Sequence, residues 1–262
     1  MSQSKVIEKN IELHEEEAEE YEEGNPDIFN QWESERIENN LDKMCEMIET
    51  GGDFSRALDI GCGTGNILRK LRDYFDESIG LDLSDDMLDV AKEELDEGRD
   101  WRLVRGKVSD LPFPDNYFEA VTAYSVFHHL PGFEEAIQEI SRVLKPGGIF
   151  YIDHEPINRE EMPVKLYIKF CEILNGESRE GLPPYEETDG LDREFCDYQI
   201  HHGDNKGLPR SEIIETCESY GFEILTEEKY LAYGSDKLNL LHPLLKSILD
   251  NEWLLMSRLG SF

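Results

Sequence analysis

The stretch ALDIGCGTG, residues 57–65, decides the fold of this chain. A short apolar run ends in Ile60 and leads into a turn with three glycines, after which apolar residues recur at helical spacing from Asn66 onward. Glycines adopt backbone dihedrals that other residues avoid, and they let a ligand approach without a Cβ in the way. The stretch therefore predicts a strand, a ligand-binding turn and a helix in succession.

Strands and helices continue to alternate after this turn. The hydrophobic pattern predicts strands at 78–82, 101–106, 118–124 and 149–152, and helices at 84–97 and 133–144. Ser84 stands where a helix N-cap is expected. Alternation of this kind is typical of an α/β domain, with a doubly wound parallel sheet and helices on both faces.

The rest of the chain divides into segments around this core. Residues 1–50 are expected to form an N-terminal helical cap, with helices at 5–22 and 28–49, and residues 51–154 the ligand-binding core. Residues 155–221 are expected to form a lid or insertion on the substrate side, with helices near 160–175 and 210–220. Residues 222–262 carry strand-like runs at 222–226 and 252–258, which are expected to complete the sheet.

Charge excludes several classes of partner. The chain has 59 acidic and 26 basic side chains among 262 residues, a formal net charge of −33. Binding to nucleic acid depends on Lys and Arg against phosphate, and anionic membranes attract basic segments, so neither partner is expected. No apolar run reaches the roughly 18 residues of a membrane span, and residues 1–17 lack the apolar core of a signal peptide. The expected location is the cytoplasm.

The acidic residues are spread along the whole chain. Hydrophobic residues still make up 39 % and aromatic residues 10 %, which argues against disorder. A folded protein this acidic repels itself at low salt, a property that halophiles exploit. We therefore expect a salt-adapted host with an acidic proteome, and the alternative is an ordinary acidic cytosolic enzyme.

The cysteines indicate neither disulfides nor a metal. There are five, widely spaced and without a Cys-x-x-Cys pair, which suits reduced thiols. The adjacent residues Asp153, His154 and Glu155 directly follow the predicted strand 149–152. If the strand conformation continues through them, their side chains cannot all point the same way. No metal site is expected.

The glycine-rich turn lacks both common phosphate-binding signatures. A dinucleotide fingerprint requires glycine where this chain has Asn66, and the P-loop motif is absent. Asp82 closes the second predicted strand about 20 residues after the turn, where a carboxylate can accept both ribose hydroxyls. The site therefore suits a nucleoside with a ribose, and S-adenosylmethionine fits that description.

Four segments in order carry a family resemblance. They are LDIGCGTG at 58–65, GLDLS at 80–84 followed by Met87 and Leu88, DLPFPDNYF at 110–118 and RVLKPGG at 142–148. With them, residues 57–154 resemble the class I S-adenosylmethionine-dependent methyltransferases, in the type 11-like group that acts on small molecules. The resemblance implies a Rossmann-like, mostly parallel seven-stranded sheet with helices on both faces and an added helical lid.

The resemblance also implies a set of cofactor contacts. Gly61 and Gly63 are expected nearest the methionine part, where Asp59 orients the loop or meets the amino group, and Asp82 is expected to hold the ribose hydroxyls. The remaining expected cofactor contacts are Cys62, Leu83, Met87, the backbone of Val108, Tyr124, Ser125 and Tyr21.

The adenine end departs from the family pattern. The family often has an acidic residue where this chain has Lys107. A charged lysine has no lone pair with which to accept the adenine amino group. Ser109 or a backbone carbonyl is expected to take over that contact.

Two histidines are the candidate catalytic residues. Methyl transfer requires a general base only where the acceptor loses a proton. His128 and His129 follow the fourth predicted strand, and Asp153, His154 and Glu155 follow the fifth. Both groups are therefore expected to face the cleft, with His128 and His154 as the preferred bases. The alternatives are that His128 and His129 cap the next helix and that Tyr21 serves packing.

The sequence therefore predicts an S-adenosylmethionine-dependent methyltransferase that passes a methyl group to a small-molecule acceptor by in-line displacement. The alternative is a non-catalytic regulatory or scaffold protein that binds S-adenosylmethionine. A nicotinamide oxidoreductase is disfavoured by Asn66. The acceptor, the methylated atom and the oligomeric state are left open.

Overall fold

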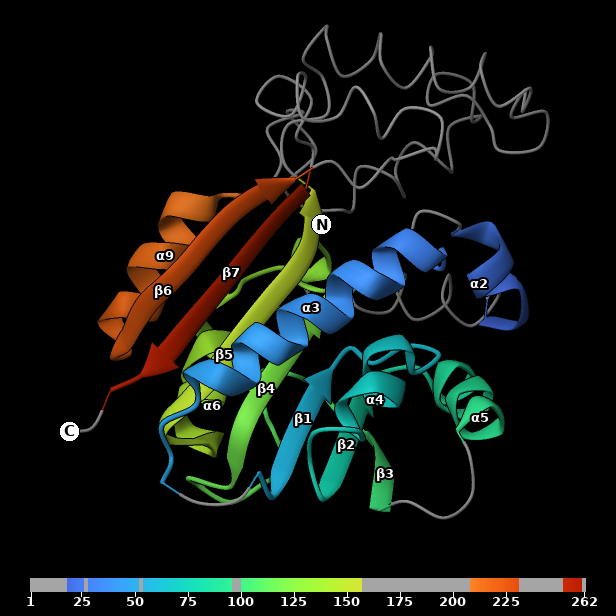
Figure 1. Ribbon diagram of the computed structural model, residues 1–262, viewed down its shortest axis with the longest axis horizontal. Coiled ribbons are helices and arrows are strands. Elements are labelled where there is room, and N and C mark those ends of the chain that lie inside the picture. The colour runs from blue at the N-terminus through green and yellow to red at the C-terminus, as the bar shows by residue number, and fades with distance from the viewer. Residues whose placement is uncertain are drawn as a thin grey trace, which may run out of the picture.

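A seven-stranded sheet organises the protein, seen here in a computed structural model that describes residues 18–25, 28–51, 54–95, 100–156, 208–230 and 252–260 (Figure 1). The strand order is β3-β2-β1-β4-β5-β7-β6, with β1 to β5 parallel and β7 antiparallel to both β5 and β6. The predicted doubly wound, mostly parallel sheet is confirmed. The strands are β1 (Arg56–Ile60), β2 (Glu77–Asp82), β3 (Asp100–Arg105), β4 (Phe118–Tyr124), β5 (Leu144–Pro156), β6 (Phe222–Tyr230) and β7 (Glu252–Leu259).

Helices cover both faces of the sheet. On one face α3 (Gln31–Met47) and α4 (Asn66–Leu71) bury apolar side chains against the strands, and on the other α6 (Glu134–Val143) and α9 (Arg210–Ser219) do so. Figure 1 shows α3 crossing in front of the sheet and α6 with α9 behind it. The remaining helical elements are α5 (Asp85–Glu94), the short α2 (Tyr21–Gly24), and two 3-10 turns, η1 (Ala18–Glu20) and η2 (Phe127–His129).

Burial and capping residues explain several of these elements. Every residue of β4 is buried, as expected for a central parallel strand covered on both faces. The Ser84 side chain accepts a hydrogen bond from the backbone N–H of Met87, which confirms the predicted N-cap of α5. Asn30 caps α3 in the same way, by accepting from the backbone N–H of Glu33.

The fifth strand is longer than expected. The sequence predicted a strand over 149–152, after a helix stop at Lys145–Gly148, but β5 already begins at Leu144, which pairs with Phe118 of β4. Gly147 permits this path: it has φ +83°, and a Cβ there would lie 2.6 Å from the carbonyl oxygen of Glu49.

The segment expected to form a lid is described only in part. Residues 157–207 lie outside the described ranges, as do residues 1–17, which include most of the helix expected at 5–22. Helix α9, which the sequence placed in the lid segment, instead belongs to the core: Ile213 and Cys217 pack in one cluster with Phe150 and Phe222. Within the ranges that the structure describes, no helix is both long and apolar enough to cross a membrane.

Candidate active site

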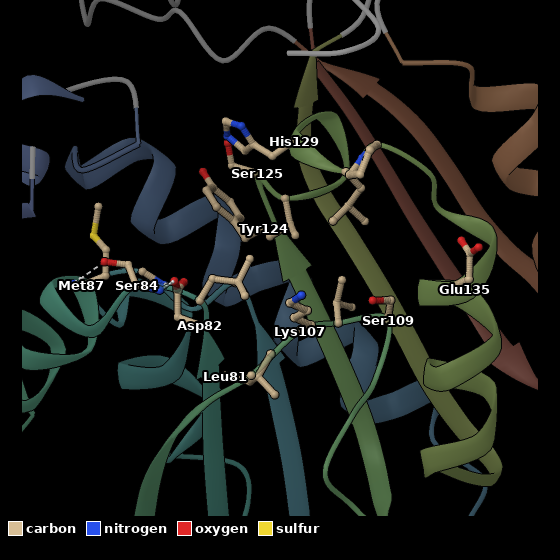
Figure 2. A pocket seen from close by; sticks show the side chains of 18 of the residues that line it. Leu81, Asp82, Ser84, Met87, Lys107, Ser109, Tyr124, Ser125, His129 and Glu135 are labelled. Carbon is tan, nitrogen blue, oxygen red and sulfur yellow. Dashed lines mark hydrogen bonds between the residues drawn. The ribbon is translucent and has the colours of Figure 1, made fainter. Parts of the chain in front are cut away.

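A cavity of about 370 Å³ lies at the carboxyl ends of β1 to β4 (Figure 2). Because parallel strands end at the same edge of a sheet, the segments that follow these four strands meet there. In Figure 2, Ser125 and His129 lie at one end of the cavity, and Leu81 and Lys107 at the other. The wall comprises Tyr21, Gly61, Gly63, Leu81, Asp82, Leu83, Ser84, Met87, Gly106, Lys107, Val108, Ser109, Tyr124, Ser125, Val126, His129, Leu130, Pro131, Gly132 and Glu135.

Two glycines of the first turn need to be glycine for different reasons. Gly61 has φ +62°, and a Cβ there would lie 2.6 Å from Cγ2 of Val126. Gly63 has φ +50°, lines the cavity, and a Cβ there would meet no protein atom within 4 Å. The missing side chain of Gly63 therefore leaves open space within the cavity itself.

Asp82 ties the glycine-rich turn to the end of β2. Its Oδ2 accepts from the backbone N–H of Gly63 at 2.9 Å, and its Oδ1 accepts from that of Ser84 at 2.9 Å. Its backbone carbonyl accepts from the N–H of Gly106 at 2.9 Å. The carboxylate thus lies on the cavity wall in a fixed orientation, with lone pairs available beyond these bonds.

Asp59 lies behind the cavity wall. The carboxyl is 1 % exposed, and its Oδ1 accepts a 2.7 Å hydrogen bond from the Thr122 hydroxyl, while Oδ2 has no partner. Burial raises the pKa of Asp59 from its ordinary 3.8 to about 7; the Thr122 bond opposes the shift and the charge of Asp82 adds to it. An unpartnered buried carboxyl oxygen suits a cationic donor.

Cys62 also lies off the cavity wall. Its thiol is buried, and Sγ lies 2.8 Å from where a Cβ of Gly80 would be, so it packs against β2. Burial, followed by the charges of Asp82 and Asp59, raises the pKa of Cys62 well above its ordinary value. Its backbone N–H donates to the carbonyl of Leu81. The side chain serves packing.

His128 is not part of the cavity wall, contrary to the expectation that it faces the cleft. Its Nδ1 lies 2.9 Å from Oε2 of the buried Glu155. Glu155 also accepts from the backbone N–H groups of Val126, Phe127 and His128 at 2.7–3.1 Å. Burial raises the pKa of Glu155 to about 7, although these three bonds oppose the shift. Glu155 thereby fixes the turn after β4, and the neighbouring His129 lines the cavity instead.

His154 is likewise not part of the cavity wall, but it packs against a residue that is. It has φ +56°, and its ring stacks on that of Tyr124 with 5.0 Å between centroids. The side chain is buried, and Nε2 has no hydrogen-bond partner. The neighbouring acids have other partners, since Asp153 bonds to Tyr230 and Glu155 to His128.

A buried polar network joins α3 to the ends of β4 and β5. Arg36 donates to both carboxylate oxygens of Glu33, and to Oδ2 of Asp153 at 2.8 Å. The Tyr124 hydroxyl donates to Oε1 of Glu33 at 2.7 Å. Burial, followed by the charges of Glu33 and Asp153, raises the pKa of Tyr124 well above its ordinary value, so the hydroxyl stays a donor. Tyr151 and Tyr230 complete the network by bonding to Asp153.

The N-terminal segment contributes Tyr21 to the cavity wall. The next residue of α2, Glu22, accepts from the Arg69 guanidinium at 2.8 Å and from the Thr64 hydroxyl at 3.2 Å. Both partners belong to the glycine-rich turn and the helix that follows it. This anchor holds α2 beside the turn.

Comparisons with known proteins match part of this chain to methyltransferases. Residues 58–152 match the family model described as a methyltransferase domain. This part of the chain is therefore similar to a methyltransferase domain. Demethylmenaquinone methyltransferase of Staphylococcus haemolyticus is 39 % identical over 124 residues, covering 44 % of this chain and 51 % of that protein. The enzyme of the same name from Staphylococcus carnosus is 42 % identical over 98 residues, covering 36 % of this chain and 41 % of its own. The chain thus spans about half the length, or less, of these curated relatives.

Solved methyltransferase structures share the fold over a greater length. A chain from the complex between the Haloferax volcanii Trm112 methyltransferase activator and a methyltransferase has a TM-score of 0.60 at 17 % identity, covering 95 % of this chain and 98 % of its own. An S-adenosylmethionine-dependent methyltransferase from Mesorhizobium loti has a TM-score of 0.55 at 20 % identity, covering 83 % and 96 %. At these identities the likeness concerns the fold.

The expected cofactor contacts account for nine of the twenty residues of the cavity wall. Nine of the eleven residues expected to bind the cofactor line the cavity; Asp59 and Cys62 do not. His129, expected to face the cleft, lines the cavity. Residues 130–132 also line it and were not predicted, although their place after the fourth strand indicated this edge of the sheet. Glu33 and Arg36 were not predicted either, and the sequence holds no comparable indication for them.

Proposed function

We propose that this protein is an S-adenosylmethionine-dependent methyltransferase that transfers a methyl group to a small-molecule acceptor by in-line displacement. The observation that carries the proposal is the cavity at the carboxyl ends of β1 to β4, with Gly63 open toward it and the Asp82 carboxylate in its wall. The methyltransferase domain match over residues 58–152 supports it independently.

The residues present suit each part of this cofactor. The unpartnered Oδ2 of Asp59 would accept from the methionine ammonium through the space beside Gly63. The Asp82 carboxylate would accept from the ribose hydroxyls with the lone pairs that Gly63 and Ser84 leave free. Leu83, Met87 and the backbone of Val108 would line the adenine.

At the adenine end the sequence left the acceptor of the amino group open between Ser109 and a backbone carbonyl. Both Lys107 and Ser109 line the cavity, which supports the Ser109 hydroxyl as a candidate. We assign that contact to Ser109, since a charged lysine has no lone pair to offer.

When bound, S-adenosylmethionine supplies a methyl group already activated by its sulfonium centre. The protein's task is then to bind and orient the cofactor and the acceptor, and to exclude water from the site. Fixing two reactants in line supplies about 7–11 kcal/mol of the barrier reduction. Tyr124 and Ser125, which line the cavity at the end of β4, would lie near the transferred methyl group, and the Ser125 backbone has φ +61°.

Where the acceptor must lose a proton, we assign the base to His129. Of the histidines considered, it lines the cavity, whereas His128 bonds to Glu155 and His154 packs behind Tyr124. His129→Asn is expected to lower the turnover number at least about 100-fold while leaving the affinity for S-adenosylhomocysteine unchanged. Unchanged turnover in the variant would exclude His129 as the base.

The acceptor is proposed to be a small, largely apolar molecule. Tyr21, Val126 and Leu130 add apolar side chains to the cavity wall to which His129 also belongs. The curated relatives are named for demethylmenaquinone, which supports an acceptor of this class. We further propose that the enzyme works in the cytoplasm of a salt-adapted host, since its net charge is −33.

The test is calorimetric titration with S-adenosylmethionine and S-adenosylhomocysteine. Wild type should bind both, and Asp82→Ala should weaken binding by about 1.5–3 kcal/mol. Gly63→Ala should also weaken binding, because the added methyl group enters space that the ligand would occupy. The positive φ of Gly63 strains this variant as well, so its affinity is compared with its free energy of unfolding. Unfolding curves confirm that each variant is folded. A folded wild type that binds neither molecule would refute the proposal.

A second candidate function remains testable in the same material. A regulatory or scaffold protein would bind S-adenosylmethionine and methylate no acceptor. Lys107 at the adenine end favours this alternative, because it departs from the acidic residue common in the family. Turnover of a quinol-type acceptor would exclude it.

A further inference from the structure

Tyr124 belongs both to the cavity wall and to the buried polar network. Its position at the end of β4 places the ring on the wall, while the hydroxyl is directed at Glu33 of α3. The imidazole of His154 stacks on the Tyr124 ring, with 5.0 Å between the centroids and 26° between the ring planes. The ring is therefore held both at its hydroxyl and across its face.

Glu33 is itself held firmly. The carboxylate is 0 % exposed, and Arg36 donates to Oε1 at 2.5 Å and to Oε2 at 2.8 Å. Arg36 also reaches Asp153 and Tyr230, on β5 and β6, and its guanidinium lies 3.8 Å above the Tyr230 ring. A carboxylate with a bidentate arginine partner has little freedom to follow a moving tyrosine.

We propose that Glu33 is a positioning residue for the methyltransferase site. It accepts a hydrogen bond from the Tyr124 hydroxyl and thereby fixes the Tyr124 ring in the cavity wall. Through Glu33, α3 of the N-terminal cap contributes to cofactor binding. The inference rests on the proposed function, because it assumes that the cavity binds S-adenosylmethionine. A preorganised wall raises ligand affinity, since less conformational freedom is lost on binding.

The chain offers a matched control. Tyr151 is also a buried tyrosine of the same network, and its hydroxyl donates to Asp153, but its ring is not part of the cavity wall. Tyr124→Phe and Tyr151→Phe each remove one hydroxyl that bonds to a buried carboxylate. If the network served stability alone, the two variants would therefore change ligand affinity to the same extent.

The experiment measures S-adenosylhomocysteine affinity by calorimetry and stability by urea unfolding. Both variants should be less stable than wild type, but only Tyr124→Phe should weaken binding, by at least about threefold. Glu33→Gln retains an oxygen that can accept from Tyr124 and should keep most of the affinity, whereas Glu33→Ala should weaken binding about as much as Tyr124→Phe does. Adding Glu33→Ala to Tyr124→Phe should weaken binding no further, because the two residues act through one hydrogen bond.

Two outcomes are decisive against the inference. Equal effects of Tyr124→Phe and Tyr151→Phe on affinity, or no effect of either, would overturn it while leaving the proposed function intact. A folded wild type that does not bind S-adenosylhomocysteine would overturn the proposed function and this inference together. If Glu33→Ala does not fold, the comparison of the two tyrosine variants, with Glu33→Gln, decides the matter alone.

Discussion

At the scale of single residues, Asp59 is a carboxyl group whose ionisation opposes folding. Burial is the main cause of its raised pKa, about 7 in the folded state against an ordinary 3.8. The folded protein therefore holds this proton more tightly than the unfolded chain does. The contribution of Asp59 to the free energy of unfolding is therefore fully present below pH 3.8, and it is lost as the pH rises from there to about 7.

Asp59→Asn removes this titration and keeps an oxygen that can accept from Thr122. The free energy of unfolding of the variant, minus that of wild type, should increase from pH 5 to pH 8, by on the order of 1 to 3 kcal/mol. Urea unfolding at several pH values measures the difference. A difference that stays constant across this range would show that Asp59 ionises as readily in the folded protein as in the unfolded chain.

The same residues show how far a sequence can predict a site. Gly63 and Asp82 could be placed because a local motif and its distance to the next strand end encode their positions. Cys62 could not be placed, because its side chain turns from the cavity toward β2. The choice between His128 and His129 depends on Glu155, which lies 27 residues away and holds His128. Such pairing is not visible in a one-dimensional pattern.

At the scale of elements, the Glu22 carboxylate links α2 to the glycine-rich turn and to α4. Glu22 joins it to Arg69 and Thr64, and the neighbouring Tyr21 lines the cavity. The Arg69 and Glu22 side chains are 24 % and 38 % exposed, so the pair adds little to global stability. We expect this ion pair to act locally instead, by keeping α2, and with it Tyr21, against the cavity.

Glu22→Ala should weaken S-adenosylhomocysteine binding by about two- to fivefold and change the free energy of unfolding by less than about 1 kcal/mol. Glu23→Ala, an exposed position on the same short helix, is the control and should leave the affinity unchanged. Calorimetry on the two variants measures the difference. Equal affinities in both would show that the Glu22 anchor does not act on the cavity.

Elements were predictable where their pattern is local. The strands β1 to β4 and the N-cap at Ser84 follow from periodicity and capping residues. The length of β5 was not predictable, because Lys145–Gly148 reads as a helix stop and the strand depends on pairing with Phe118. Helix α9 was assigned to a lid for a similar reason: only its packing against β6 shows that it belongs to the core.

At the scale of the whole molecule, the excess of negative charge is distributed rather than paired. The formal charge of −33 remains although basic side chains on several elements already form ion pairs, among them Arg56, Lys70, Arg142 and Arg258. Mutual repulsion among unpaired carboxylates is relieved when the chain expands, so it opposes the compact state. Salt weakens this repulsion, because the screening length falls from about 10 Å at 0.1 M to about 3 Å at 1 M.

The melting temperature should therefore rise as potassium chloride increases from 0.05 M to 1 M, by about 5 °C or more. Differential scanning calorimetry measures it, with sucrose as a control that stabilises without screening charge. If screening is the cause, most of the rise should occur below 1 M, where the screening length changes most. A steady further rise up to 3 M would point instead to exclusion of salt from the protein surface, and a flat profile would mean that the acidic side chains lie too far apart to oppose folding.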